Sequence, residues 1–135
     1  MTSFFETPSG AAIPAGTRIY AIADIHGCCD LLEHVLARID EDLARHPIAG
    51  PMEVFLGDYV DRGPDSRDVI NVLVDRGRTR NAVFLRGNHE ALLLGFLQDP
   101  RVLDAWRELG GFATLLSYGV APSSGTTDKM RDLSQ

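Results

Sequence analysis

Three short apolar runs, each ending abruptly in glycine and polar residues, constrain the fold of this chain most. The runs span residues 18–23, 53–56 and 82–85 and are rich in Val, Ile, Phe and Tyr. Short continuous runs of this kind are typical of strands buried on both faces of a sheet. A helical pattern follows each run. The order β-α-β-α-β-α therefore predicts an α/β fold with mostly parallel strands and flanking helices.

The segments between and after the runs carry apolar residues at three- and four-residue steps, which predicts amphipathic helices. The first would begin at Asp30 and the second at Ser66, both plausible N-caps. Further helices are expected over residues 91–97 and about 102–118, the last interrupted at Gly110-Gly111.

Composition narrows the partners and the compartment. The 135 residues carry a formal net charge of −6, which argues against a generic basic nucleic-acid binder. No apolar run approaches the roughly 20 residues of a membrane helix, and the first residues do not resemble a secretory signal. Cys28 and Cys29 are adjacent, so we expect two reduced thiols. These features predict a cytoplasmic protein with no nucleic-acid or membrane partner.

Polar side chains follow all three predicted strands. Asp24 and His26 are two residues apart and so point to the same side of an extended chain, while Asp58 and Asn88 follow the second and third strands. Ligands gather beyond the C-terminal ends of parallel strands. Carboxylate, imidazole and amide ligands suit Mn²⁺, Fe²⁺ or Zn²⁺. Two such cations can clamp a phosphoryl group.

Other side chains near these strand ends fit phosphate chemistry. His89 could protonate a leaving alkoxide, and Arg62 and Arg86 could bind phosphate oxygens with their planar guanidinium groups. Taken singly, residues 61–64 read as an ordinary turn and residues 88–90 as a helix start. Three such motifs, each at a strand end and nearly equally spaced, favour a functional site.

The segments 24–27, 57–63 and 87–90 resemble the signature motifs of the phosphoprotein phosphatase group of calcineurin-like metallophosphoesterases. Bacterial serine/threonine protein phosphatases and symmetrical diadenosine tetraphosphate hydrolases belong to this group. The later segment 110–119 resembles the one that follows in bacterial members and favours the protein phosphatase branch, with the tetraphosphate hydrolase as the alternative. The resemblance spans roughly residues 18–119.

The resemblance implies which motif residues are metal ligands. Asp24 and His26 match ligands of a first metal, and Asp58 matches the ligand that bridges two metals. Asn88 matches a ligand of the second metal. Members of the full family bind two divalent cations. The resemblance implies Mn²⁺ as the metal, with Fe or Zn as alternatives.

The same resemblance implies the catalytic residues. His89 matches the general acid, and Asp61 matches the carboxylate that orients it. Arg62 and Arg86 match arginines that bind phosphate. The implied reaction is hydrolysis of a phosphomonoester or phosphoanhydride without a phosphoenzyme, on a phosphorylated protein or a small phosphoester.

No histidine follows His89, although the family completes its second metal site with two later histidines. We therefore expect residues 18–119 to be the N-terminal half of the family's two-sheet domain, after a loose lead-in over 1–17 and before a polar tail over 120–135. The first interpretation is a truncated member that has little activity and binds one metal. The alternatives are a split enzyme completed by a partner chain and a non-catalytic metal- or phosphate-binding module. An uncovered apolar sheet face predicts self-association.

Overall fold

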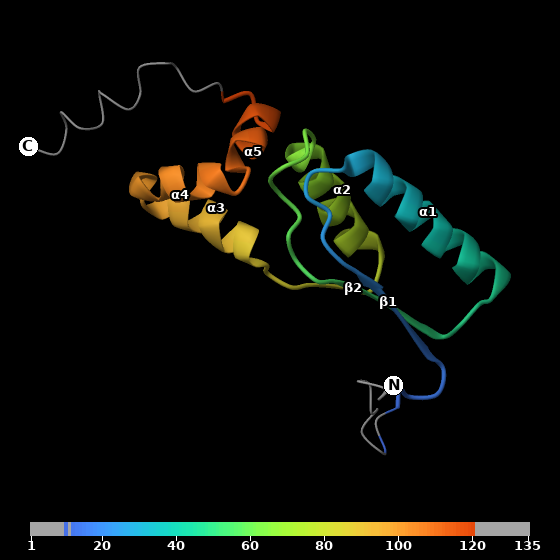
Figure 1. Cartoon of the computed structure of the whole chain (residues 1–135). Helices are drawn as coiled ribbons and strands as arrows, with labels where there is room; N and C mark the ends of the chain where they lie inside the picture. Colours follow the sequence, from blue (N-terminus) through green and yellow to red (C-terminus); the bar gives the residue numbers. More distant parts are fainter. Residues whose placement is uncertain (1–9, 11, 121–135) are drawn as a thin grey trace, which may run out of the picture.

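The computed structural model describes residue 10 and residues 12–120, which form a three-stranded parallel sheet with two groups of helices (Figure 1). In chain order the elements are β1 (Thr17–Ile22), α1 (Cys29–Arg45), β2 (Gly50–Phe55), α2 (Ser66–Thr79), β3 (Ala82–Phe84), α3 (Asn88–Gln98), the short 3₁₀ helix η1 (Pro100–Val102), α4 (Leu103–Glu108) and α5 (Gly111–Ser117). This order confirms the predicted α/β fold.

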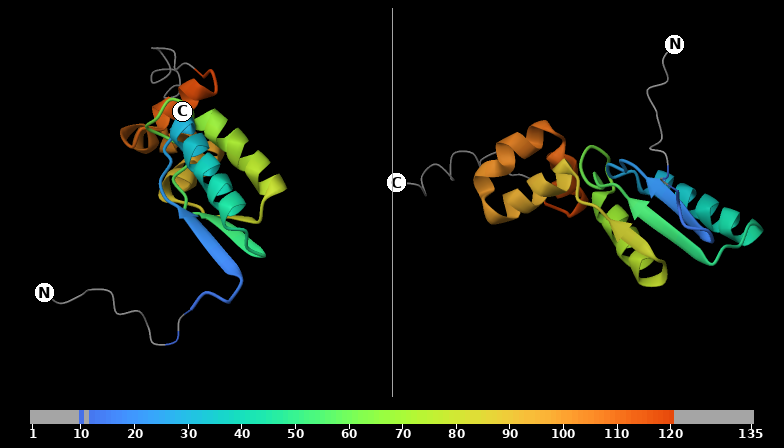
Figure 2. Two further views of the ribbon diagram at one scale, coloured as in Figure 1. Left: turned by 90° about the vertical axis from the view of Figure 1, so that its right-hand side faces the viewer. Right: turned by 90° about the horizontal axis from the view of Figure 1, so that it is seen from below.

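The strands lie in the order β1-β2-β3, and Ile22, Phe55 and Phe84 are aligned across them. Helices α1 and α2 lie together on one face of this sheet (Figures 1 and 2). Their apolar residues pack with the sheet into one core, which includes Leu32, Leu36, Ile39, Phe55, Val69 and Leu73. The amphipathic periodicity of the sequence therefore identified these buried residues, but Leu31, Val35 and Val74 of the same apolar pattern are exposed.

The other face of the sheet is exposed in the described part of the chain. The register aligns Ala21 with Val54 and Val54 with Val83, so these side chains share that face. Ile19 is 41% exposed and Leu85 is 47% exposed. The expected uncovered apolar surface is thus present, and self-association through it stays a prediction.

Helices α3, α4 and α5 form a second group, beyond the C-terminal ends of the strands (Figures 1 and 2). The fully buried Trp106 of α4 packs on Phe96 of α3, with 5.1 Å between the ring centroids. A Cβ at Gly111 would collide with the Trp106 indole, so only glycine lets α5 approach this closely.

The expected helix starts need correction. Helix α1 begins at Cys29 rather than after an Asp30 cap, and no side chain caps it. Ser66 is the first residue of α2 rather than its cap, because its hydroxyl accepts a hydrogen bond from the Asp61 N–H at 3.1 Å. The break at Gly110 is confirmed, with φ of 97°.

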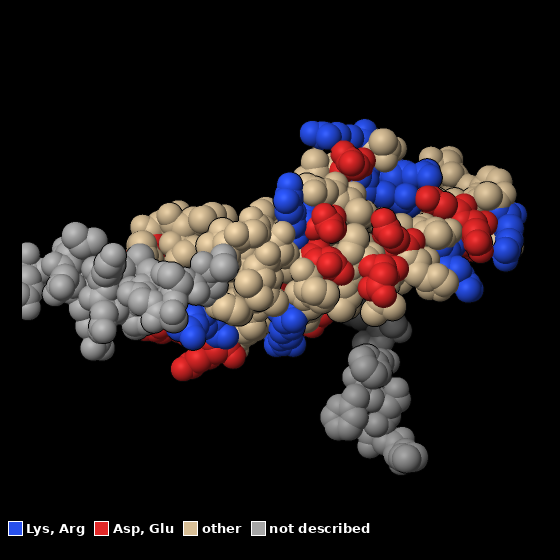
Figure 3. Space-filling view, turned by 90° about the horizontal axis from the view of Figure 1, so that it is seen from above, with Lys and Arg blue, Asp and Glu red and all other residues tan. Residues whose placement is uncertain are grey.

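A partly buried ion network joins the sheet to both covering helices. Arg76 of α2 donates to the buried Glu53 of β2 at 2.6 and 2.8 Å, and to Asp40 of α1 at 2.7 and 2.8 Å. The Arg76 guanidinium holds the pKa of Asp40 below its usual value. Elsewhere, basic and acidic side chains are interleaved on the face seen in Figure 3.

The predicted lead-in and tail fall largely outside the described residues. No helix among residues 12–120 is long and apolar enough to cross a membrane.

Candidate metal centre and catalytic site

The loops that follow β1 and β2 are joined by backbone hydrogen bonds. The N–H groups of Ile25 and His26 both donate to the Asp58 carbonyl, at 3.0 and 2.9 Å. The Gly27 N–H donates to the Tyr59 carbonyl at 2.9 Å. The first and second motifs are therefore held side by side by main-chain contacts.

Glu90 of α3 fixes the third motif against the second. Its carboxylate accepts hydrogen bonds from the backbone N–H groups of Asp58 and Tyr59, each at 2.7 Å, and from that of Gly87 at 2.9 Å. A Cβ at Gly87 would collide with the Asp58 carboxylate. Glu90 was not among the site residues predicted from the sequence. Its place three residues after Gly87 was a signal, because glutamate there often binds the N–H that precedes a helix.

The Tyr59 side chain also connects the loop after β2 to the segment before α3. Its hydroxyl donates to the Leu85 carbonyl at 2.6 Å, next to the third motif. Burial raises the pKa of Tyr59 to about 12, so the phenol stays protonated and keeps donating.

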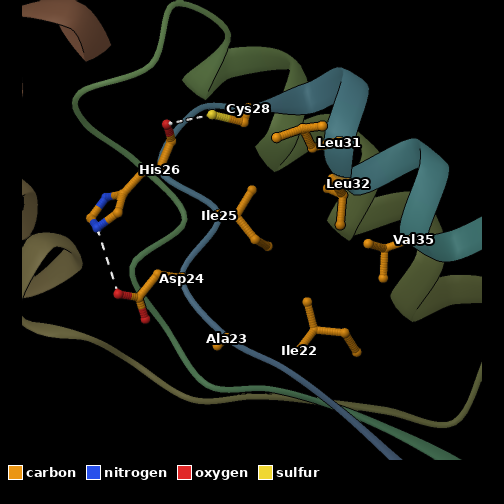
Figure 4. Close-up of a pocket in the computed structure, with 9 residues that line it drawn as sticks. All are labelled: Ile22, Ala23, Asp24, Ile25, His26, Cys28, Leu31, Leu32 and Val35. Carbon is orange, nitrogen blue, oxygen red and sulfur yellow. Dashed lines mark hydrogen bonds and ion pairs between the residues drawn. The ribbon is translucent and has the colours of Figure 1, made fainter.

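His26 is oriented by the loop after β2. Its Nδ1 lies 2.9 Å from the Val60 carbonyl oxygen. A carbonyl only accepts, so Nδ1 carries the proton and Nε2 keeps a free lone pair. Nε2 lies 3.9 Å from Asp24 Oδ2. Figure 4 shows both side chains leaning toward one another, away from the apolar residues of α1.

Three side chains at this rim could share a cation. The ligating atoms of His26, Asp58 and His89 all lie within 4.8 Å of one another. Asp24 adds an exposed carboxylate beside His26. These oxygen and imidazole nitrogen donors fit a divalent cation of the Mn²⁺, Fe²⁺ or Zn²⁺ type. The fixed tautomer of His26 fits it as well, because it leaves a nitrogen available.

His89, one of the three members of this cluster, also forms a buried pair with Asp61. His89 Nδ1 lies 2.7 Å from Asp61 Oδ2, and the side chains are 2% and 0% exposed. The His89 ring meets the His26 ring edge-on, with 4.6 Å between centroids. Arg62 Nη2 lies 3.5 Å from His89 Nε2.

The other predicted site residues lie at the same rim. Asn88 is the first residue of α3 and is exposed, and Arg86 is exposed two residues before it. The structure therefore brings the eight predicted site residues to the C-terminal ends of the three strands. Their individual roles stay predictions.

An apolar hollow of about 290 Å³ lies between the loop after β1 and helix α1 (Figure 4). Leu31, Leu32 and Val35 line its helix side, and Ile22 and Ile25 line its loop side. Asp24 and His26 stand at its edge, so it adjoins the cation cluster without adding ligands to it.

The comparison with known families agrees with this architecture. The model of the calcineurin-like phosphoesterase family matches residues 17–130. The chain belongs to this metallophosphoesterase family, which implies a requirement for divalent metal ions.

Its relatives are bacterial. The chain is 32% identical over 90 residues to an asymmetrical bis(5'-nucleosyl)-tetraphosphatase, PrpE, of Oceanobacillus iheyensis, which covers 64% of this chain and 36% of the relative. It is 37% identical over 83 residues to a symmetrical bis(5'-nucleosyl)-tetraphosphatase of Delftia acidovorans. The matched segment covers 62% of this chain and 27% of that relative. The chain thus spans about a third of these relatives or less.

Proposed function

We propose that this chain carries the N-terminal part of a metal-dependent phosphoester hydrolase that cleaves a bis(5'-nucleosyl) polyphosphate. One observation carries the proposal: the cation-ligand candidates His26 and Asp58 lie within 4.8 Å of His89, which pairs with the buried Asp61, at the ends of three parallel strands. Water activation and leaving-group protonation need these two kinds of group side by side.

Asp24, His26 and Asp58 would hold one divalent cation, and Asp58 and Asn88 would contribute to a second. When bound, such cations neutralise phosphoryl oxygens and activate water as the nucleophile. Mn²⁺, Fe²⁺ and Zn²⁺ all suit these ligands. The contact between His26 Nδ1 and the Val60 carbonyl supports the proposal. It places the proton on Nδ1 and so leaves the Nε2 lone pair available for a cation.

His89 would act as the general acid. Asp61 holds its Nδ1 proton, which leaves Nε2 on the other side of the ring, 3.5 Å from Arg62 Nη2. From there a proton on Nε2 can pass to the oxygen that leaves the phosphorus atom. Arg62 and Arg86 would bind the remaining phosphate oxygens, since both are exposed near the same rim.

The choice of substrate rests on the relatives. The segment 110–119 favours a phosphoprotein substrate, but the relatives named above are bis(5'-nucleosyl)-tetraphosphatases. That finding favours the alternative, a small phosphoanhydride substrate. No observation on the described residues favours a partner chain that completes the site.

The test is hydrolysis of bis(5'-adenosyl) tetraphosphate by the purified chain with Mn²⁺, followed by chromatography of the released nucleotides. A phosphoserine peptide serves as the competing substrate. Because no histidine follows His89 to complete a second metal site, we expect slow nucleotide release. This release should be lost in Asp58→Asn and His89→Gln and kept in His34→Gln, a change on the exposed side of α1. Release of phosphate from the peptide alone would restore the protein phosphatase reading. Release from neither substrate by the folded, metal-loaded chain would reject hydrolysis by this chain.

A further inference from the structure

The buried Asp61 carboxylate is held by two residues that lie more than forty positions later in the chain. Oδ1 accepts a hydrogen bond from the Thr114 hydroxyl at 2.6 Å. Oδ2 accepts one from the Trp106 indole N–H at 2.8 Å, in addition to that from His89 Nδ1. The carboxylate is fully buried, so these donors take the place of water. Together they fix the direction of both oxygens.

The same late segment also holds the backbone of the second motif. Asp61 and Arg62 have φ of 74° and 69°, a left-handed conformation that is unfavourable for residues with a side chain. The Asp61 N–H donates to the Thr114 hydroxyl oxygen at 2.9 Å, and the Arg62 N–H donates to the Gly110 carbonyl at 3.1 Å. The unusual turn is therefore held from α5 and from the glycine before it.

We propose that residues 106–114 form a positioning clamp, in which Trp106 and Thr114 orient the His89 imidazole through Asp61. Both are positioning residues, because they contact Asp61 and not the rim itself. If either donor is removed, one Asp61 oxygen loses its fixed direction. His89 Nδ1 then loses its fixed acceptor, and Nε2 loses its fixed position. The orientation of His89 stands on geometry alone, while its use in hydrolysis rests on the proposed function.

A purely structural role makes a different prediction. Trp106 could simply fill the space between α3 and α5, with its N–H satisfied by the nearest oxygen. In that case Trp106→Phe and Thr114→Val would lower stability and leave the His89 hydrogen bond as it is. The state of the His89 ring therefore separates the two roles.

The experiment is nuclear magnetic resonance of the chain labelled with ¹⁵N-histidine. The chain has four histidines, and His89→Gln assigns the signals of His89. Two-bond proton–nitrogen spectra report which ring nitrogen carries the proton. We expect His89 Nδ1 to carry a proton that exchanges slowly with water, because the pair is buried.

Four variants test the clamp. Thr114→Val and Trp106→Phe should speed exchange of the His89 Nδ1 proton by about tenfold or more, the effect of losing one hydrogen bond to a charged group. Thr114→Ser keeps the hydroxyl and should restore the wild-type signals. Ser117→Ala removes a hydroxyl from the same helix, one that donates to the Thr114 carbonyl and not to Asp61, and should leave them unchanged.

Wild-type exchange and tautomer in both Thr114→Val and Trp106→Phe would overturn the clamp. If Thr114→Val does not fold, the comparison of Trp106→Phe with wild type decides, since phenylalanine keeps the ring that packs on Phe96. The proposed function fails separately. If the His89 signals respond as expected while the metal-loaded wild type releases no nucleotide, the clamp stands and the hydrolase does not.

Discussion

Replacing Glu90 by glutamine should loosen the loops of the second and third motifs while leaving every predicted ligand in place. The two carboxylate oxygens of Glu90 accept hydrogen bonds from the backbone N–H groups of Asp58, Tyr59, Val60 and Gly87. Each oxygen takes two of them. Glutamine offers a single carbonyl oxygen. Its NH₂ group would therefore replace the second acceptor, and the two N–H groups that it faces would lose their hydrogen bonds.

The magnitude follows from those two lost contacts. A hydrogen bond to a charged group contributes about 1.5–3 kcal/mol, and two of them about 3–6 kcal/mol. Glu90 is only half-buried, so we expect the lower end, about 3 kcal/mol. Small domains unfold with a free energy of roughly 5–15 kcal/mol, so this loss would remove a large share of the stability.

Urea unfolding followed by Trp106 fluorescence measures the effect. Glu41→Gln is the matched control, because Glu41 is exposed and lies 3.4 Å from Arg45 in a surface pair. Such pairs contribute about 0.5 kcal/mol or less. A Glu90→Gln variant as stable as the Glu41→Gln control would refute the account of how the three motifs are held together.

Three further predictions concern the rest of the fold. Arg76→Leu leaves the buried Glu53 unpaired and should cost about 3–5 kcal/mol in urea unfolding, against about 0.5 kcal/mol or less for Arg45→Ala; equal losses would contradict the partly buried network. Arg76 lowers the folded-state pKa of Asp40, so this stabilisation is present above the unfolded pKa and is lost as pH falls through the folded pKa. Asp40→Asn should therefore weaken the fall in Tm below about pH 4, and an unchanged acid limb would argue against that linkage. Val83→Lys on the exposed sheet face should reduce binding of an apolar dye and any self-association seen in sedimentation. No change in either would mean that this face does not mediate self-association.

Much of the fold could be predicted because its signals are local. Each strand is a short apolar run, and α1 and α2 each show one apolar stripe, so the order of elements follows from periodicity. The glycines and aspartates at the strand ends then placed Asp24, Asp58 and Asn88 at one edge, since parallel strands end on the same side of their sheet.

What holds the site together could not be predicted in the same way. Glu90 acts on residues more than thirty positions earlier, and Thr114 acts on Asp61 across 53 positions. Neither spacing leaves a periodic trace in the sequence. Helix starts were misplaced for a related reason: the Ser66 hydroxyl, a good N-cap by type, is bonded to the Asp61 N–H.

The central claim is that the rim at the three strand ends binds a divalent cation, and calorimetric titration of the purified chain with Mn²⁺ tests it most directly. We predict saturable binding that is lost or strongly weakened in Asp58→Asn and His26→Gln and retained in His34→Gln. Binding that is absent in the folded wild type, or equal in all four proteins, would contradict the account.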